Sequence, residues 1–204
     1  MLRKYIHHTG RELATNRFVQ VFSPPMALPH DLLRNGPTRL RALEPEDVEW
    51  LMRWENAPDH WEVSGTTAPF SRTALETLCK GHQDIYTEGQ LRWIIEERAK
   101  PVGAVDLYDF SSLHQRSGIG ILVDPGHRGK GTAGRALDIA VKHARDVLLL
   151  HSLHAEVHAD HDASVHLFQS AGFSKVGHYA DWTRTKQGWM DVVLFQLTFN
   201  EQGA

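Results

Sequence analysis

Residues 119–148 constrain the fold more than any other part of this 204-residue chain. Apolar residues alternate from Ile119 to Val123, which predicts a strand. A glycine-rich basic loop follows, and beyond it a helical period of apolar residues is formed by Ala136, Leu137, Ala140, Val141, Ala144, Val147 and Leu148. Glycines let a backbone approach an anion, and the free N–H groups of a first helical turn point at it. The segment therefore predicts a site for a phosphate group.

Two nucleotide-binding motifs compete with this interpretation. A P-loop requires a lysine followed by Ser or Thr after its second glycine, whereas Lys130 precedes Gly131. The dinucleotide pattern G-x-G-x-x-G is met by Gly129, Gly131 and Gly134. This motif also needs an acidic residue about 20 residues later, and the candidate, Glu156, lies somewhat further along the chain. A dinucleotide site and a plain turn without a ligand remain alternatives on these residues alone.

Three segments resemble the GNAT superfamily of N-acetyltransferases. Residues 128–133 match its Arg/Gln-x-x-Gly-x-Gly/Ala loop. Residues 160–173 look like its Asn-x-x-Ser-x-x-Leu-Tyr-x-x-x-Gly-Phe segment, and residues 40–47 resemble its opening strand and helix. The three occur in the family's order, and the resemblance covers residues 38–199. Within the family the chain looks similar to spermidine/diamine acetyltransferases and to ribosomal-protein N-terminal acetyltransferases.

The resemblance implies an α/β fold, with a mixed, mostly antiparallel sheet whose central strands splay apart and about four flanking helices. It also implies acetyl-CoA as acyl donor. The family's pyrophosphate loop corresponds to Arg128, Gly129, Lys130, Gly131, Thr132 and Ala133. In the family, backbone groups bind the pantetheine arm and polarise the thioester, and these correspond to Ile121, Leu122 and Val123. Further cofactor contacts of the family correspond to His161, Ser164 and Phe168.

The implied reaction moves an acetyl group to a primary amine, first of all on a polyamine such as spermidine. Acetylation of a protein N-terminus or lysine, as on a ribosomal protein, is the alternative. A CoA-binding module with little catalysis is a second one. The first helix and the following loop are acidic, which suits a polycation but also a solvated helix face: Glu44, Asp47, Glu49, Glu55, Asp59 and Glu62.

Catalysis requires a neutral amine, because an ammonium group with a pKa near ~10.4 is almost wholly protonated at pH 7. A carboxylate would remove that proton. We expect Asp106, on the strand before the phosphate loop, or Glu62, in the aromatic loop expected at residues 56–71, with Asp109 and Glu96 as further candidates. Phe168 departs from the family, which has a tyrosine there as acid for the leaving thiolate. Loss of a general acid lowers the rate roughly 100-fold in an enzyme that uses one.

Composition limits the other possibilities. A net charge of −3 gives no reason to expect nucleic acid as a partner. A single cysteine, Cys79, excludes a disulfide framework, and we expect it in the core. No apolar run reaches membrane-spanning length and no signal peptide is visible, so we expect a cytoplasmic protein. Fourteen histidines lack metal-site spacing, so no metal is expected. A homo-oligomer is compatible with the sequence.

The chain divides at residue 37. Residues 1–37 are predicted to be an N-terminal extension with a second possible start at Met26, and residues 38–200 the acetyltransferase domain. Strands are expected at 38–43, 90–97, 102–108, 117–123 and 153–158, with a terminal hairpin of 176–184 and 189–199. Helices are expected from Pro45, from Ser71 to Gly81, after the phosphate loop, and from Asp162 to Gly172, whereas 56–71 is expected to be a loop.

Overall fold

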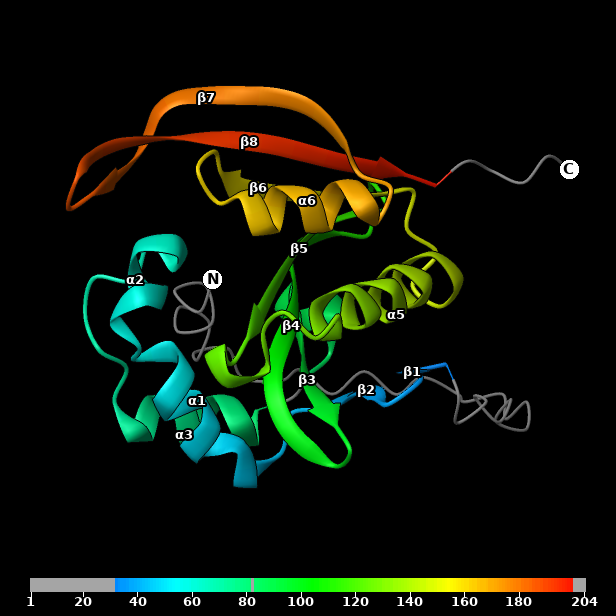
Figure 1. Ribbon diagram of the computed structural model, residues 1–204. Helices are drawn as coiled ribbons and strands as arrows, with labels where there is room; N and C mark the ends of the chain where they lie inside the picture. Colours follow the sequence, from blue (N-terminus) through cyan, green and yellow to red (C-terminus); the bar gives the residue numbers. More distant parts are fainter. Residues whose placement is uncertain (1–31, 82, 200–204) are drawn as a thin grey trace, which may run out of the picture.

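A single open sheet organises the computed structural model, which describes residues 32–81 and 83–199 (Figure 1). Its strand order is β1-β2-β3-β4-β5-β6-β8-β7, and every neighbouring pair is antiparallel except β5 and β6. The mixed, mostly antiparallel sheet predicted from the sequence is confirmed. The strands are β1 (Arg34–Asn35), β2 (Thr38–Ala42), β3 (Leu91–Glu97), β4 (Lys100–Ser111), β5 (Arg116–Val123), β6 (Ser152–His158), β7 (Ser174–Thr185) and β8 (Gly188–Thr198).

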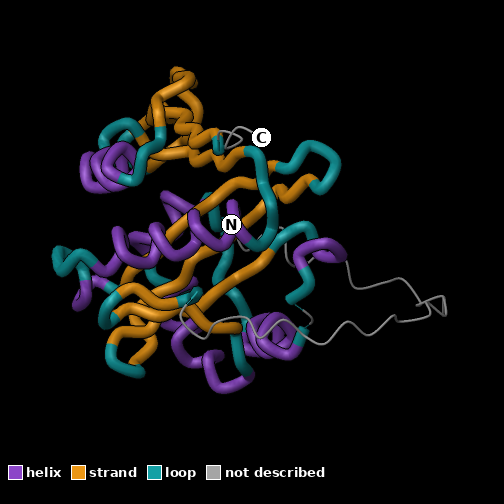
Figure 2. Tube along the Cα trace, turned by 90° about the vertical axis from the view of Figure 1, so that its right-hand side faces the viewer, coloured by secondary structure: helices purple, strands orange, loops and turns teal. Residues whose placement is uncertain are grey.

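Helices cover the sheet on both sides (Figure 2). Helices α1 and α3 pack together, α5 runs across β1 and β2 and along β5, and α6 contacts α5 and β7. The elements are η2 (Pro45–Asp47), α1 (Val48–Glu55), α2 (Pro58–Ser64), α3 (Arg72–Lys80), α4 (Ile85–Glu88), η3 (Pro125–His127), α5 (Thr132–Asp146) and α6 (Asp162–Ser170).

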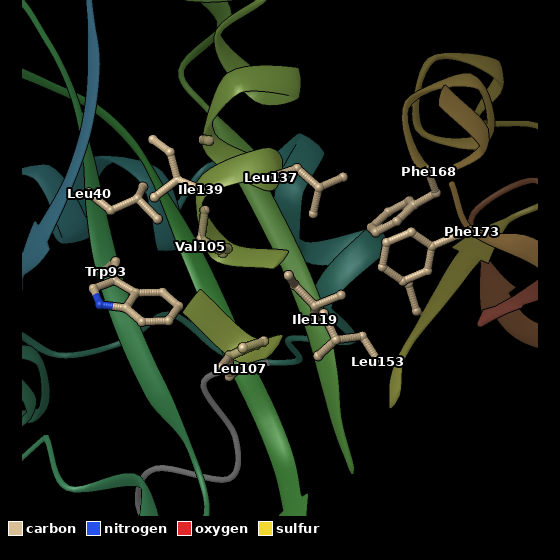
Figure 3. Packing of buried hydrophobic residues seen from close by; sticks show 14 of the residues in the cluster. Leu40, Trp93, Val105, Leu107, Ile119, Leu137, Ile139, Leu153, Phe168 and Phe173 are labelled. Carbon is tan, nitrogen blue, oxygen red and sulfur yellow. The ribbon is translucent and has the colours of Figure 1, made fainter. Parts of the chain in front are cut away.

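The buried side chains form two clusters, one on each face of the sheet. Trp93 and Ile95 belong to the cluster under α5, whereas Ile94, between them on β3, belongs to the cluster under α1 and α3. Successive side chains of a strand point to opposite faces, so this alternation places the two clusters. Figure 3 shows the larger cluster, in which Leu137 and Ile139 of α5 meet the strands.

The segment 56–71, expected to be a loop, contains helix α2. Pro58 occupies its first turn, and Gly65 ends it in the left-handed conformation with φ of 65°. Trp61 donates from Nε1 to the carbonyl of Glu55 at 2.9 Å, which fixes the helix against the end of α1. The prediction was wrong because this short helix has no sustained apolar period. The short helix α4 was missed for the same reason.

The boundary drawn at residue 37 falls inside a small hairpin. Strand β1 pairs with β2, Leu33 packs against the larger cluster, and Asn35 donates to Asp138 of α5 at 2.9 Å. Two paired residues have no period that a sequence pattern can show, so this strand was not expected. The rest of the predicted extension, including Met26, lies outside the described residues.

Two predictions from composition can be compared with the structure. Cys79 is buried in the cluster under α1 and α3, and burial raises the pKa of its thiol to about 11, so its core position is confirmed. Over the described residues, no helix combines the length and apolar character needed to cross a membrane.

Candidate functional site

The parallel strands β5 and β6 pair only briefly. Their register contains three pairs, and the last joins Gly118 to His154. Beyond Gly118, β5 continues to Val123 with β4 on one side, while β6 continues along β8. The remaining backbone groups of β5 therefore face an opening between the two strands, below β6 and α6 in Figure 1. This is the splayed arrangement that the resemblance implied, with Ile121, Leu122 and Val123 on its edge.

A close aromatic contact marks the point where the two strands part. The ring of Tyr108 lies across Gly118, where an added Cβ would sit 2.3 Å from Tyr108 Cε2. The same ring meets His154 of β6 edge-on at 5.9 Å between centroids. Burial raises the pKa of Tyr108. Position 118 therefore requires glycine, because any side chain would collide with this ring.

The loop between β5 and α5 is fixed by its own side chains. Asp124 accepts from the Gly126 N–H at 3.0 Å and from Trp54 Nε1 at 3.1 Å, so α1 is tied to the loop. Arg128 donates from Nε to the carbonyl of Val123 at 3.0 Å, and Lys130 donates from Nζ to the carbonyl of Gly126 at 2.7 Å. The loop is thus a preorganised turn, carrying two cations.

Two glycines shape the entrance to α5. Gly129 and Gly131 have φ of 72° and 74°, a conformation that other residues adopt at a cost of about 1–2 kcal/mol. Gly131 is the N-cap of α5 and offers no side chain to the first-turn N–H groups. Thr132 is buried and Ala133 half-buried at the start of the helix. Uncapped N–H groups, a helix dipole and nearby cations fit the pyrophosphate of acetyl-CoA.

Two of the predicted cofactor residues, His161 and Ser164, hydrogen-bond to each other at the start of helix α6. His161 is its N-cap, and Nδ1 accepts from the Ser164 N–H at 3.1 Å. Phe168 is buried, edge-on to Phe173 at 5.2 Å and stacked on Phe195 at 6.2 Å. Figure 3 shows the rings of Phe168 and Phe173 projecting toward Leu137 and Ile119. Helix α6 holds these residues beside the opening. Their contact with a cofactor stays a prediction.

Asp106 belongs to a buried ion cluster. Both of its oxygens accept from Arg92, from Nε at 2.6 Å and from Nη2 at 2.7 Å. The third guanidinium nitrogen, Nη1, donates to Glu55 Oε1 at 2.6 Å. Asp106 also lies opposite Gly120 of β5, next to the open edge. Both carboxylate oxygens of Asp106 are therefore occupied by Arg92, and an incoming ammonium group would have to displace that guanidinium to reach either of them.

The cluster carries more negative than positive charge. Burial raises the pKa of Glu55, but Arg92 and His60 outweigh that effect and lower it to about 2. His60 Nε2 lies 3.6 Å from Glu55 Oε2. Two carboxylates therefore share one guanidinium, with a histidine at the edge. Sequence reasoning missed this cluster because Glu55 and Arg92 are 37 residues apart.

The acidic surface expected at the first helix is smaller than its composition suggests. Several of its carboxylates hold arginines: Asp47 binds Arg41, Glu49 binds Arg72 and Glu55 binds Arg92. Glu96, another candidate base, also binds Arg41, at 2.6 Å. Asp59 and Glu62 lie on α2, and their side chains are outside the described part of the structure. Asp47, Glu49 and Glu55 therefore fit neither of the two interpretations weighed for these carboxylates, a surface for a polycation or a solvated helix face, because each is paired with an arginine.

Known proteins similar to this chain include polyamine acetyltransferases. The chain is 27% identical to a spermidine N(1)-acetyltransferase of Vibrio cholerae over 148 residues, which cover 72% of this chain and 84% of that protein. It is also 27% identical to a spermidine N(1)-acetyltransferase of Escherichia coli K12 over 139 residues, covering 68% of this chain and 74% of that protein.

A solved structure and a family model agree with these relatives. The crystal structure of the Vibrio cholerae spermidine N-acetyltransferase in complex with CoA and spermine superposes with a TM-score of 0.74 at 25% identity, covering 80% of this chain and 96% of that one. Residues 38–174 match the family model of the acetyltransferase (GNAT) domain. The open edge of β5, its phosphate loop and these matches lead to one conclusion: the chain belongs to the GNAT family and is an acetyltransferase that uses acetyl-CoA.

Proposed function

We propose that this enzyme acetylates a primary amine of a polyamine such as spermidine. The observation that carries the proposal is the buried cluster of Glu55, Arg92 and Asp106, which places an excess carboxylate beside the open edge of β5. An excess of carboxylates over guanidinium groups in a buried cluster beside the site favours a cationic substrate. Two relatives described as spermidine N(1)-acetyltransferases support the same substrate class.

The donor half of the proposed site is the opening and the loop. Residues 128–133 would hold the pyrophosphate through backbone N–H groups and two cations. The edge residues Ile121, Leu122 and Val123 would bind the pantetheine arm through their backbone, while their side chains remain in the sheet. His161, Ser164 and Phe168 would flank the arm from α6. Acetyl-CoA supplies the thioester from which the amine takes the acetyl group.

The acceptor half must remove a proton from the incoming ammonium group. We assign this step to Glu62, because Asp106 is held by Arg92 through both oxygens. Asp106 and Glu55 then act as counter-charges that favour the polycation, and they keep Arg92 in place. The carboxylate passes the ammonium proton on to solvent. The neutral amine nitrogen then forms the new bond to the acetyl carbon as the bond to sulfur breaks. The nitrogen loses a second proton to solvent as the amide forms, and the thiolate takes one proton from solvent.

A substrate panel tests the proposal. Purified full-length protein is incubated with acetyl-CoA and with spermidine, a monoamine of similar length, or a short peptide with a free N-terminus. Thiol release and product mass report turnover. We expect the highest kcat/KM with spermidine, because the monoamine has one cation and gains less from the buried carboxylates. Turnover of the peptide in the absence of spermidine turnover would contradict the proposal.

Paired variants on α2 test the base. Glu62→Gln removes the proton acceptor and should lower kcat roughly 100-fold, with rescue as pH rises and more amine is neutral. Asp59→Asn makes the same loss of one negative charge on the same helix and serves as the control. Equal effects of the two substitutions would show that α2 contributes general negative charge only.

We also propose that the enzyme forms a homo-oligomer through β7. This edge strand and its partner β8 expose large apolar side chains: Val176, Tyr179, Trp182 and Trp189. Tyr179 and Trp182 stack at 4.3 Å between centroids. Trp182→Lys should lower the mass measured by light scattering, whereas Leu113→Lys, which changes another exposed apolar residue in the β4–β5 turn, should not. A monomeric parent protein would contradict this proposal.

A further inference from the structure

The ring of Tyr108 occupies the inner end of the opening between β5 and β6. Tyr108 lies opposite Gly118, which is also the last residue of β5 that pairs with β6. The ring crosses β5 at Gly118 and meets His154 of β6 edge-on. Its hydroxyl hydrogen-bonds to the backbone of Glu156, two residues beyond the last paired position of β6. The side chain therefore reaches from the point where pairing stops into the region where the strands have parted.

Tyr108 projects to the face of the sheet that carries the buried ion cluster. Successive side chains of a strand point to opposite faces, and the preceding residue, Leu107, packs in the cluster under α5. Tyr108 therefore shares the other face with Asp106, whose carboxylate is among the charges that raise the pKa of the phenol. The side chain is half-buried, so part of it stays accessible. Tyr108 thus lines the opening on the face that holds the proposed acceptor half.

Several contacts hold the ring in this place. Gly118 leaves the space for it, because an added Cβ would lie 2.5 Å from Tyr108 Cζ as well as 2.3 Å from Cε2. Ser117 donates from Oγ to the carbonyl of Tyr108 at 2.8 Å, which ties the two strands together beside the ring. Moving the ring out of the opening would also break the hydrogen bond to Glu156 and the contact with His154. The opening therefore ends at a wall that is held from several sides.

The direction of the acyl donor follows from the proposed donor site, on which this inference rests. The phosphate loop comes directly after Val123, at the C-terminal end of the open edge. Because a strand rises about 3.3 Å per residue, the edge from Val123 back to Gly118 is about 17 Å long. An arm that is anchored at the loop and extended along this edge carries its thioester toward Gly118. The acyl group, which lies beyond the sulfur, then points at the ring of Tyr108.

We propose that Tyr108 determines which acyl length this enzyme accepts, because its ring leaves room for an acetyl group and excludes longer acyl groups. A propionyl group would have to push the ring away from His154 and Glu156. One methylene group more or less in an apolar pocket changes discrimination by about 10-fold or more. The volume of the ring carries this selection, and the hydroxyl only helps to hold the ring. Removal of the ring and removal of the hydroxyl should therefore have different effects.

The test compares acetyl-CoA with propionyl-CoA on the full-length protein, with spermidine as acceptor. Wild type should have a kcat/KM at least ~10-fold higher for acetyl-CoA. Tyr108→Leu removes the ring and should abolish most of this preference, whereas Tyr108→Phe keeps the ring and should keep the preference. Each preference is a ratio measured on one preparation, so a smaller folded fraction in a variant affects both donors equally and cancels.

Calorimetry without an amine measures the same selection in binding. The ratio of the Kd values for the two thioesters should follow the kinetic preference in wild type and in both variants of Tyr108. The matched control is Tyr86→Leu, which makes the same change at an exposed tyrosine of α4 and should keep the wild-type ratio in both measurements.

The outcomes separate this inference from the proposals on which it rests. Equal use and equal binding of the two thioesters by wild type, or an unchanged preference in Tyr108→Leu, would overturn it while leaving the donor site intact. A loss of preference in Tyr108→Phe as large as in Tyr108→Leu would assign the selection to the hydroxyl and overturn the role of the ring. Failure of wild type to bind either thioester would overturn the donor site and this inference with it. Selective binding of acetyl-CoA that is lost in Tyr108→Leu, without turnover of spermidine, would support the inference and overturn the proposed acceptor.

Discussion

At the scale of single residues, Gly131 is a position of the proposed donor site where a side chain would be strained. It has φ of 74°, and an added Cβ would lie 2.9 Å from Arg135 Nη1. Gly131→Asp should therefore strain the turn, displace Arg135 and bring a negative charge to the phosphates. We expect at least ~10-fold weaker binding of acetyl-CoA by calorimetry, equivalent to about 1.4 kcal/mol.

Gly134 provides a matched control for that substitution. An added Cβ at Gly134 would meet nothing within 4 Å, and its φ is not in the left-handed region. Gly134→Ala should keep the affinity for acetyl-CoA and stabilise α5 by about 0.5–1 kcal/mol. If Gly131→Asp bound acetyl-CoA as tightly as wild type, the phosphate loop would be assigned wrongly.

Phe168 raises the question of the proton for the leaving thiolate. Phe168→Tyr should raise kcat, because it restores a phenol on α6 at the position where the family has one. The gain should be clearest at low pH, where the phenol is still protonated. Phe168 packs against Phe173 and Phe195, so an unpartnered hydroxyl would cost about 1–3 kcal/mol. A lower kcat together with a lower melting temperature would show that the ring is core only.

At the scale of elements, the ion cluster joins α1 to β3 and β4. The pKa of Glu55 is about 2 in the folded protein against 4.5 as its ordinary value. A group whose pKa is lowered by folding stabilises the protein above its unfolded pKa, and that contribution disappears as pH falls through the folded pKa. We therefore expect the contribution of Glu55, on the order of 3 kcal/mol at pH 7, to decline between about pH 4.5 and pH 2.

Glu55→Gln isolates this contribution. Urea unfolding at several pH values should show a large loss of stability at pH 7 relative to wild type, and a difference that shrinks as the pH falls below 4.5. Glu49→Gln makes the same chemical change at an exposed ion pair with Arg72 and should have little effect. A difference between wild type and Glu55→Gln that does not depend on pH would contradict the ion-pair origin of this stability.

The elements predicted from the sequence are those with a clear period. The alternation in β5 and the helical spacing in α5 each fix which face is buried, so both elements were placed correctly. Helix α2 was missed because it is held by Pro58, by the left-handed Gly65 and by one hydrogen bond from Trp61. Such ends and contacts give no periodic signal in a sequence.

The turn that we propose as the donor half of the site could be predicted because its conformation depends on neighbouring residues. Gly129, Gly131 and their neighbouring cations are consecutive in the sequence. The backbone conformation of these residues shapes the turn. The proposed acceptor half depends on partners that are far apart in the sequence, such as Arg92 with Glu55 and Asp106. A carboxylate in a sequence shows its charge but not which arginine will neutralise it, so the charge available to a substrate emerges only from the fold.

At the scale of the whole molecule, the order of the strands creates the site. Strand β5 pairs fully with β4 but only at three positions with β6, because β6 continues with β8 and β7 as a separate wing. The helix between β5 and β6 begins at the end of the open edge, which brings its N-terminus to the same place. One crossover connection therefore builds both the opening and the anion site.

Among the described residues, the members of both buried clusters lie between Leu33 and Phe199, and the first strand in that range, β1, begins at Arg34. We propose that the catalytic domain needs nothing before this hairpin, so a shortened chain beginning at Met26 should fold. Its melting temperature should lie within a few degrees of that of the full chain, and its kcat/KM for spermidine should be unchanged.

A matched chain beginning at Thr38 removes β1, the packing of Leu33 and the hydrogen bond from Asn35 to Asp138. That chain should lose several degrees, since about 1 kcal/mol shifts the melting temperature of a domain this size by about 2–4 °C. A large loss already at Met26 would show that earlier residues belong to the domain.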